Sequence, residues 1–193
     1  QYELDLARIK DRNIQKLINI EVWKIIKQFV PISYFKKIGY FIDDLKLDIA
    51  KVKEVYGISN VEDLVELSAN YKYSYFKKSE KSKINDNNIL AWNVVAKYEA
   101  KNQIVNTFNP DNIPTLIKEL QAIFYDNKGT VERTKAKLNQ YGIKFVLVQK
   151  LEQTPIDGYT FWSGNNPTIA LTLRHSRIDN FAFTIMHELG HIA

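Results

Sequence analysis

The chain has 193 residues, of which 45% are hydrophobic and 12% aromatic, enough to bury a sizeable core in one or two domains. It has no cysteine, which excludes disulfides and thiolate metal sites, and no leader-like or long apolar run that would indicate secretion or a membrane partner. The expected protein is therefore globular, soluble and cytoplasmic. A net charge of +5 permits an acidic partner such as nucleic acid, but it is more often an ordinary solvated surface.

The N-terminal third has the apolar spacing of helices. Hydrophobic residues recur every three or four positions over residues 6–30, which predicts an amphipathic helix or a pair of helices. A short helix opened by proline and closed by glycine is expected within residues 31–39. Two more are predicted over Leu45–Tyr56 and residues 61–68, the latter with Asn60 as its N-cap.

Residues 71–88 are polar and charged and have no sustained period, so they are the expected linker. Aromatic residues alternate with lysines in this stretch. Such a pattern can stack on bases and neutralise phosphates, or it can anchor on the protein body with its lysines in water. The predicted domains are residues 1–84, a helical region with its linker, and residues 85–193.

The second domain is expected to open with helices. Apolar positions predict one over residues 90–108, and a turn leads into another that has Pro114 in its first turn. The buried stripe of that helix is predicted to be Leu116, Ile117, Leu120 and Ile123. Thr130 is the expected cap of a third helix, which ends near Gly142.

A change to β-branched and aromatic residues comes next. It predicts three strands, over residues 143–149, 158–162 and 168–173. A final helix, capped by Asp179 or Asn180, is expected to cross behind the sheet and run to His191. The predicted fold class is α+β, a helical N-terminal region followed by a small, largely antiparallel sheet and this last helix.

The final helix carries an H-E-x-x-H motif at residues 187–191. Residues four apart share one helix face, so His187 and His191 can bind a single Zn²⁺, while Glu188 can take a proton from the water that zinc activates. The chemistry that fits is metal-assisted hydrolysis of a peptide bond. With only three histidines in the chain, a random match has a chance on the order of one per cent, which disfavours a helical interaction module with an accidental motif.

A catalytic zinc site of this type needs a third protein ligand. His175, Asp179 and Glu152 are the candidates within the chain. They are better explained as a loop histidine, a helix cap and a surface residue of a hairpin. We therefore expect zinc in the full-length protein and weak or absent zinc, with activity in doubt, in this fragment.

Residues 166–191, N-P-T-I-A-L-T-L-R-H-S-R-I-D-N-F-A-F-T-I-M-H-E-L-G-H, resemble the core of the ImmA/IrrE-like metallopeptidase family. The resemblance implies a zincin-like domain in which His187 and His191 are zinc ligands and Glu188 is the catalytic base. The family's third ligand lies after the motif, so residues 85–193 would be a peptidase domain truncated just after it.

Three upstream segments, residues 56–64, 76–79 and 91–100, resemble the middle region of HigA-like regulators. In those proteins a helix-turn-helix DNA-binding domain precedes a peptidase domain of this kind. Residues 2–9 resemble the segment directly after such a DNA-binding domain, which is itself not found in the chain. DNA contact is therefore expected only through a domain outside these residues.

The leading hypothesis is a zinc-dependent endopeptidase domain of a bacterial transcriptional regulator, which hydrolyses a peptide bond in a protein such as a repressor. The alternative is an antitoxin or transcription-factor region that binds a toxin, senses a signal or dimerises without proteolysis. The expected partner is a protein substrate, a repressor or a toxin. The sequence leaves open the substrate, the operator and the oligomeric state, a homodimer included.

Overall fold

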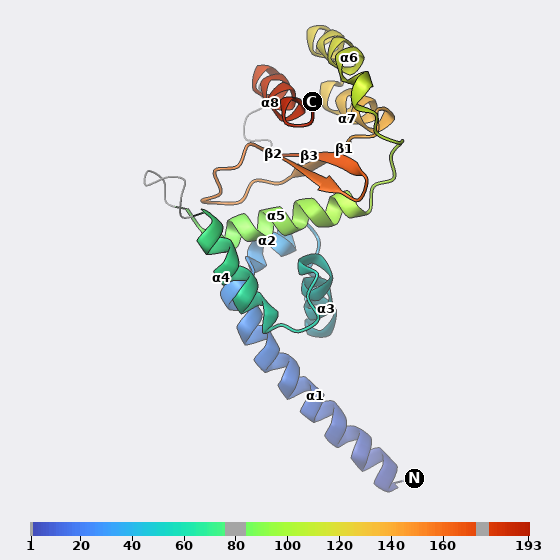
Figure 1. Cartoon of the computed structure of the whole chain (residues 1–193). Coiled ribbons are helices and arrows are strands. Elements are labelled where there is room, and N and C mark those ends of the chain that lie inside the picture. Colours follow the sequence, from blue (N-terminus) through green and yellow to red (C-terminus); the bar gives the residue numbers. More distant parts are fainter. Residues whose placement is uncertain (1, 76–83, 173–177) are drawn as a thin grey trace. The chain divides into compact units, whose positions relative to one another are not determined.

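The computed structural model describes residues 2–75, 84–172 and 178–193 (Figure 1). The α+β class is confirmed. The helices of the first half are α1 (Tyr2–Phe29), α2 (Ile32–Lys37), α3 (Leu45–Tyr56), α4 (Asp63–Tyr75) and α5 (Asp86–Lys101). The second half contains the 3₁₀ turn η1 (Pro110–Asn112), α6 (Ile113–Asp126), α7 (Thr130–Gln140), β1 (Lys144–Val148), β2 (Gly158–Ser163), β3 (Asn166–Thr172) and α8 (Ile178–Gly190). Within the described part, no helix is long and apolar enough to span a membrane.

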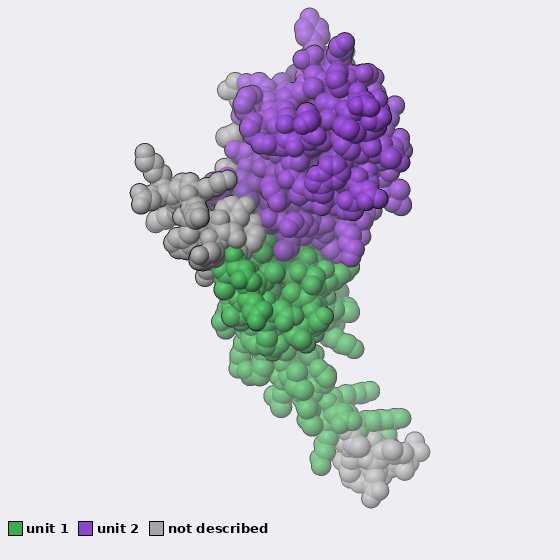
Figure 2. Space-filling view, in the orientation of Figure 1, with its two compact units in different colours: residues 1–91 green, residues 92–193 purple. Residues whose placement is uncertain are grey.

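The chain divides into two compact units, residues 1–91 and 92–193, which Figure 2 colours separately. The division falls inside α5, whereas the sequence placed the domain boundary at residues 84 and 85. The expected linker is shorter than predicted, because α4 continues through Tyr75 and α5 already begins at Asp86. Residues 76–83 lie outside the described residues, so the two interpretations of the aromatic and lysine pattern stay predictions.

Capping groups explain where the helices of the first unit begin and end. α3 has the predicted bounds: the Asp44 carboxylate accepts the Leu47 N–H at 3.0 Å, and Gly57, at φ +66°, provides the left-handed residue that ends the helix. The next helix begins two residues later than the predicted residue 61. α4 begins at Asp63, and the Asp63 carboxylate accepts the backbone N–H of Asn60 at 3.0 Å.

Aromatic side chains form the core of the first unit. Phe35 is fully buried, its ring stacks on Tyr56 at 6.0 Å, and it also contacts Phe41. Burial raises the pKa of Tyr56, because the phenolate would have to lose its hydration. Among the described residues, none offers a hydrogen bond to the Tyr56 hydroxyl.

We expect Tyr56→Phe to leave the free energy of unfolding unchanged or to raise it by about 1 kcal/mol, because the variant no longer buries an unsatisfied hydroxyl. The folded-state pKa of Tyr56 lies above its unfolded value of about 10, so the wild type loses stability as the pH rises past 10. Tyr56→Phe removes that part of the loss. Urea unfolding at pH 7 and above pH 10 tests this, with Tyr125→Phe as the exposed control.

The sheet of the second unit has the strand order β1-β3-β2. β2 and β3 form an antiparallel hairpin, with Gly158 opposite Leu171, and β1 pairs with β3 in parallel, with Phe145 opposite Ile169. The expectation of a largely antiparallel sheet is therefore corrected to a mixed one. The hairpin occupies one edge of β3, and β1 pairs with the other edge in the same direction as β3.

Helices cover both faces of this sheet. α6, α7 and α8 lie on one side and residues 92–101 of α5 on the other (Figure 1). The Trp92 indole N–H donates to the Thr172 hydroxyl at 2.7 Å on the α5 side. The core on the opposite side consists of Leu116, Leu120, Ile123, Leu138, Ile143, Phe145, Ile169, Leu171, Phe181, Ile185 and Leu189. Of the stripe predicted for α6, Ile117 alone is only partly buried.

Two predicted helix ends differ in this unit. α5 ends at Lys101 rather than at residue 108, because Gln103 pairs with the edge of β1: its side chain donates to the Phe145 carbonyl at 2.8 Å and accepts the Phe145 N–H at 3.1 Å. Thr130 does not cap α7. Gly129 holds the cap position in a left-handed conformation, and Thr130 is the first helical residue.

Candidate metal centre

α8 presents the H-E-x-x-H motif at its C-terminal end. Phe181, Ile185 and Leu189 are spaced four apart and bury one face of the helix in the core. The helix begins at Ile178, so Asp179 lies in its first turn instead of capping it; the Asp179 carboxylate accepts the Asn180 N–H at 3.0 Å. Burial of the apolar face leaves the histidines of the motif on the solvent side.

The two histidines meet at one point. The Nε2 atoms of His187 and His191 are 3.3 Å apart, and the two rings are perpendicular. His191 lies one residue beyond α8, where its N–H donates to the Glu188 carbonyl at 3.1 Å in a tightened last turn. Two nitrogens that bind one tetrahedral zinc at about 2.0–2.1 Å lie about 3.3–3.4 Å from each other. The pair therefore fits two ligand positions of a zinc ion.

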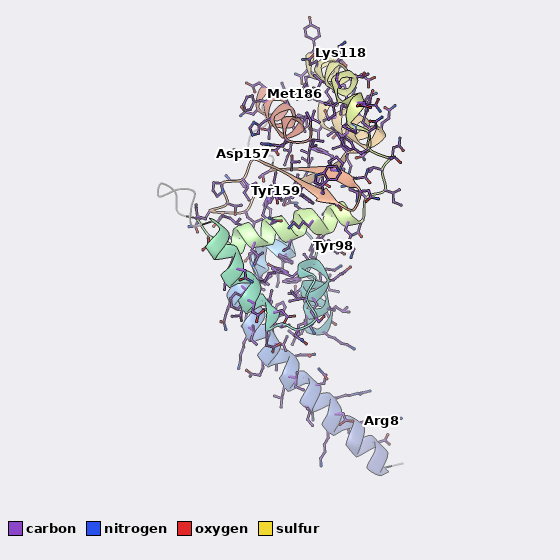
Figure 3. The ribbon with its side chains drawn as sticks, in the orientation of Figure 1. Arg8, Tyr98, Lys118, Asp157, Tyr159 and Met186 are labelled. Carbon is purple, nitrogen blue, oxygen red and sulfur yellow. The ribbon has the colours of Figure 1, made fainter. Side chains whose placement is uncertain are left out.

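Glu188 has the opposite environment. Glu188 is 5% exposed, and its side chain contacts β2, the strand whose Tyr159 is labelled in Figure 3. The Thr160 hydroxyl lies 2.7 Å from Glu188 Oε2, and a Cβ at Gly158 would lie 2.6 Å from Glu188 Oε1. The Glu188 carboxylate is therefore enclosed by β2, whereas the neighbouring His187 is exposed.

The Phe183 ring lies beside the imidazole of His187. One helical turn before His187, its ring stacks on the imidazole at a centroid distance of 6.2 Å with an interplanar angle of 17°. Phe183 is 74% exposed. This contact places an aromatic surface beside the candidate metal centre.

No third ligand joins the histidine pair among residues 2–75, 84–172 and 178–193. Glu152 lies in an exposed turn between β1 and β2, which do not pair, so it is not the hairpin residue that we expected. Asp179 occupies the first turn of α8, at the other end of the helix from His191. His175 falls outside the described residues.

Comparisons of the chain with protein-family models, with curated proteins and with solved structures give no match. The resemblance to the ImmA/IrrE-like metallopeptidases therefore stays a prediction, carried by residues 166–191. The geometry of the histidine pair does not depend on that resemblance.

Sequence reasoning found His187, Glu188 and His191 but assigned no role to Gly158 or Thr160. Gly158 opens the predicted strand, where a turn already accounts for a glycine, so it gave no separate signal of a group packed against it. Gly158 and Thr160 are two positions apart in a predicted strand, so they share a face. Only the packing of α8 on the sheet determines which helix covers that face.

Proposed function

We propose that this chain contains the metal centre of a zinc-dependent endopeptidase, in the cytoplasm and within a transcriptional regulator as the resemblance implies. One observation carries the proposal: the Nε2 atoms of His187 and His191 are 3.3 Å apart, the separation of two ligands of one tetrahedral zinc. Glu188, between them in the sequence, provides the carboxylate that hydrolysis requires.

Each of the three residues has a distinct part in this chemistry. Bound zinc would acidify water and polarise the scissile carbonyl of a peptide. His187 and His191 would hold the ion through Nε2, each as a neutral imidazole. Glu188 would take a proton from the attacking water and later deliver it to the leaving amine. The substrate is a protein segment, such as part of a repressor or a toxin.

A second candidate function is binding without proteolysis, as an antitoxin or transcription-factor region. Residues 9–20 of α1 favour it, because large apolar side chains face solvent there, with Leu17 65% exposed. The other members of this exposed set are Ile9, Ile14, Ile18 and Ile20. Apolar surface of this kind is typical of protein interaction sites. A binding module, unlike a peptidase, keeps its function when Glu188 is replaced.

Two histidines alone should bind zinc weakly, so we expect zinc in large excess to raise the melting temperature of the wild-type chain, because an ion that binds only the folded state stabilises it. His187→Ala and His191→Ala should each abolish the shift, since one imidazole alone holds zinc still more weakly. Differential scanning calorimetry with and without zinc, on protein first treated with a chelator, measures the effect. His175→Ala serves as the comparison.

If zinc shifts the melting temperature of His175→Ala and wild type equally, His187 and His191 bind the ion without His175. If His175→Ala loses the shift, His175 is the third ligand. The metal centre would be refuted by a wild-type chain that shows no shift even with zinc in large excess. A shift that survives in both alanine variants of the pair would refute it as well.

A further inference from the structure

Strand β2 supplies the surroundings of the Glu188 carboxylate. The Thr160 hydroxyl oxygen lies 2.7 Å from Glu188 Oε2 and 3.2 Å from the Glu188 carbonyl oxygen. A hydroxyl has a single proton to donate, and the carboxylate is both the nearer and the stronger acceptor. Thr160 therefore donates to the side chain of Glu188.

Gly158 provides the space that this carboxylate fills. It lies on the same face of β2 as Thr160, and its φ is not positive, so backbone freedom does not explain the glycine. A Cβ at this position would be 2.6 Å from Glu188 Oε1 and 2.8 Å from the Thr184 methyl group. Any side chain at residue 158 would displace the carboxylate or the helix that carries it.

Burial limits the conformations that the Glu188 side chain can adopt. Glu188 is 5% exposed, so water does not compete well for its oxygens and the hydrogen bond from Thr160 is stronger than it would be on the surface. A glutamate side chain loses rotamer entropy when it is fixed. Fixing it during folding removes that cost from the reaction, and a base misplaced by about 1 Å can lose about 100-fold in rate.

We infer that Gly158 and Thr160 are positioning residues for Glu188: Thr160 orients the carboxylate through its hydroxyl, and Gly158 keeps the space open. The catalytic meaning of this inference rests on the proposed peptidase function. The cradle formed by Gly158 and Thr160 acts through Glu188 alone, so its loss should leave zinc binding by His187 and His191 intact.

The first test compares Thr160→Val, which keeps the shape and removes the hydroxyl, with Thr160→Ser, which keeps the hydroxyl. On a quenched-fluorescence peptide library, we expect Thr160→Val to lower kcat about 10- to 100-fold and Thr160→Ser to retain most of it. Gly158→Ala should lower kcat similarly. The Kd for zinc, measured by calorimetric titration, should change less than about twofold in all three, because no ligand is touched.

The second test needs neither zinc nor activity. A double-mutant cycle of Thr160→Val and Glu188→Ala in the metal-free full chain reports the coupling between the two side chains in the folding equilibrium. For a hydrogen bond to a charged group we expect a coupling of about tenfold or more in the folding constant.

The outcomes separate the inference from the proposed function. Coupling in a chain that neither binds zinc nor cleaves peptides would support the cradle and overturn the peptidase. Zinc binding and cleavage with no coupling, or equal kcat in Thr160→Val and wild type, would overturn the cradle and keep the peptidase. Equal loss in Thr160→Val and Thr160→Ser would overturn the role assigned to the hydroxyl.

Discussion

Glu188→Gln should retain zinc and lose peptide hydrolysis by about 10²- to 10⁴-fold, the usual contribution of a general base. Glutamine has nearly the volume of glutamate and still accepts a hydrogen bond from Thr160, so the buried site stays filled. It cannot take up the proton of the attacking water. Metal analysis and cleavage of a peptide library or of a candidate repressor, in parallel with thermal melting, test the prediction.

Glu152→Gln is the matched control, because it makes the same chemical change at an exposed turn residue. It should hydrolyse at the wild-type rate. Equal cleavage by Glu188→Gln and Glu152→Gln would refute the role of Glu188 as base. If neither variant nor the wild type cleaves anything, and the binding of a toxin or regulator survives in Glu188→Gln, the second candidate function is favoured.

Elements with local signals could be predicted from the sequence, and elements set by distant partners could not. α3 has its predicted bounds because its end is set by the neighbouring Gly57. The end of α5 depends on Gln103, whose partner Phe145 is 42 residues away and leaves no mark near the helix. The parallel pairing of β1 with β3 likewise joins residues far apart in the chain, such as Phe145 and Ile169.

The candidate site likewise has residues that the local sequence predicts and residues that only the packing brings together. His187, Glu188 and His191 lie within five residues, so helical periodicity alone predicts that the histidines converge. Thr160 reaches Glu188 from 28 residues earlier, through the packing of α8 on β2. The sequence predicts two strand residues that share a face, but it does not say that this face meets the carboxylate. A third ligand has no signal of either kind among the described residues.

Gly142→Ala should cause the largest loss of stability among glycine substitutions in the second unit. Gly142 joins α7 to β1 at φ +78°, a conformation that costs an L-residue about 1–2 kcal/mol. A Cβ there would lie 2.5 Å from the Phe108 backbone nitrogen, which cannot move aside as a flexible side chain can. The Gly142 carbonyl also accepts the Asn166 side-chain amide at 2.7 Å, so a shift of this turn disturbs the start of β3.

Gly164→Ala separates the cost of the left-handed backbone from the cost of the steric clash with Phe108. Gly164, at φ +65° in the β2–β3 turn, has the same backbone strain, but no described atom lies within 4 Å of the Cβ position. We expect Gly164→Ala to lower the free energy of unfolding by about 1–2 kcal/mol and Gly142→Ala by about 1–3 kcal/mol more, the usual cost of overpacking. Urea unfolding of both variants measures the difference. If both variants lose the same free energy of unfolding, the segment carrying Phe108 moves to accommodate the new Cβ. Backbone conformation alone would then require glycine at residue 142.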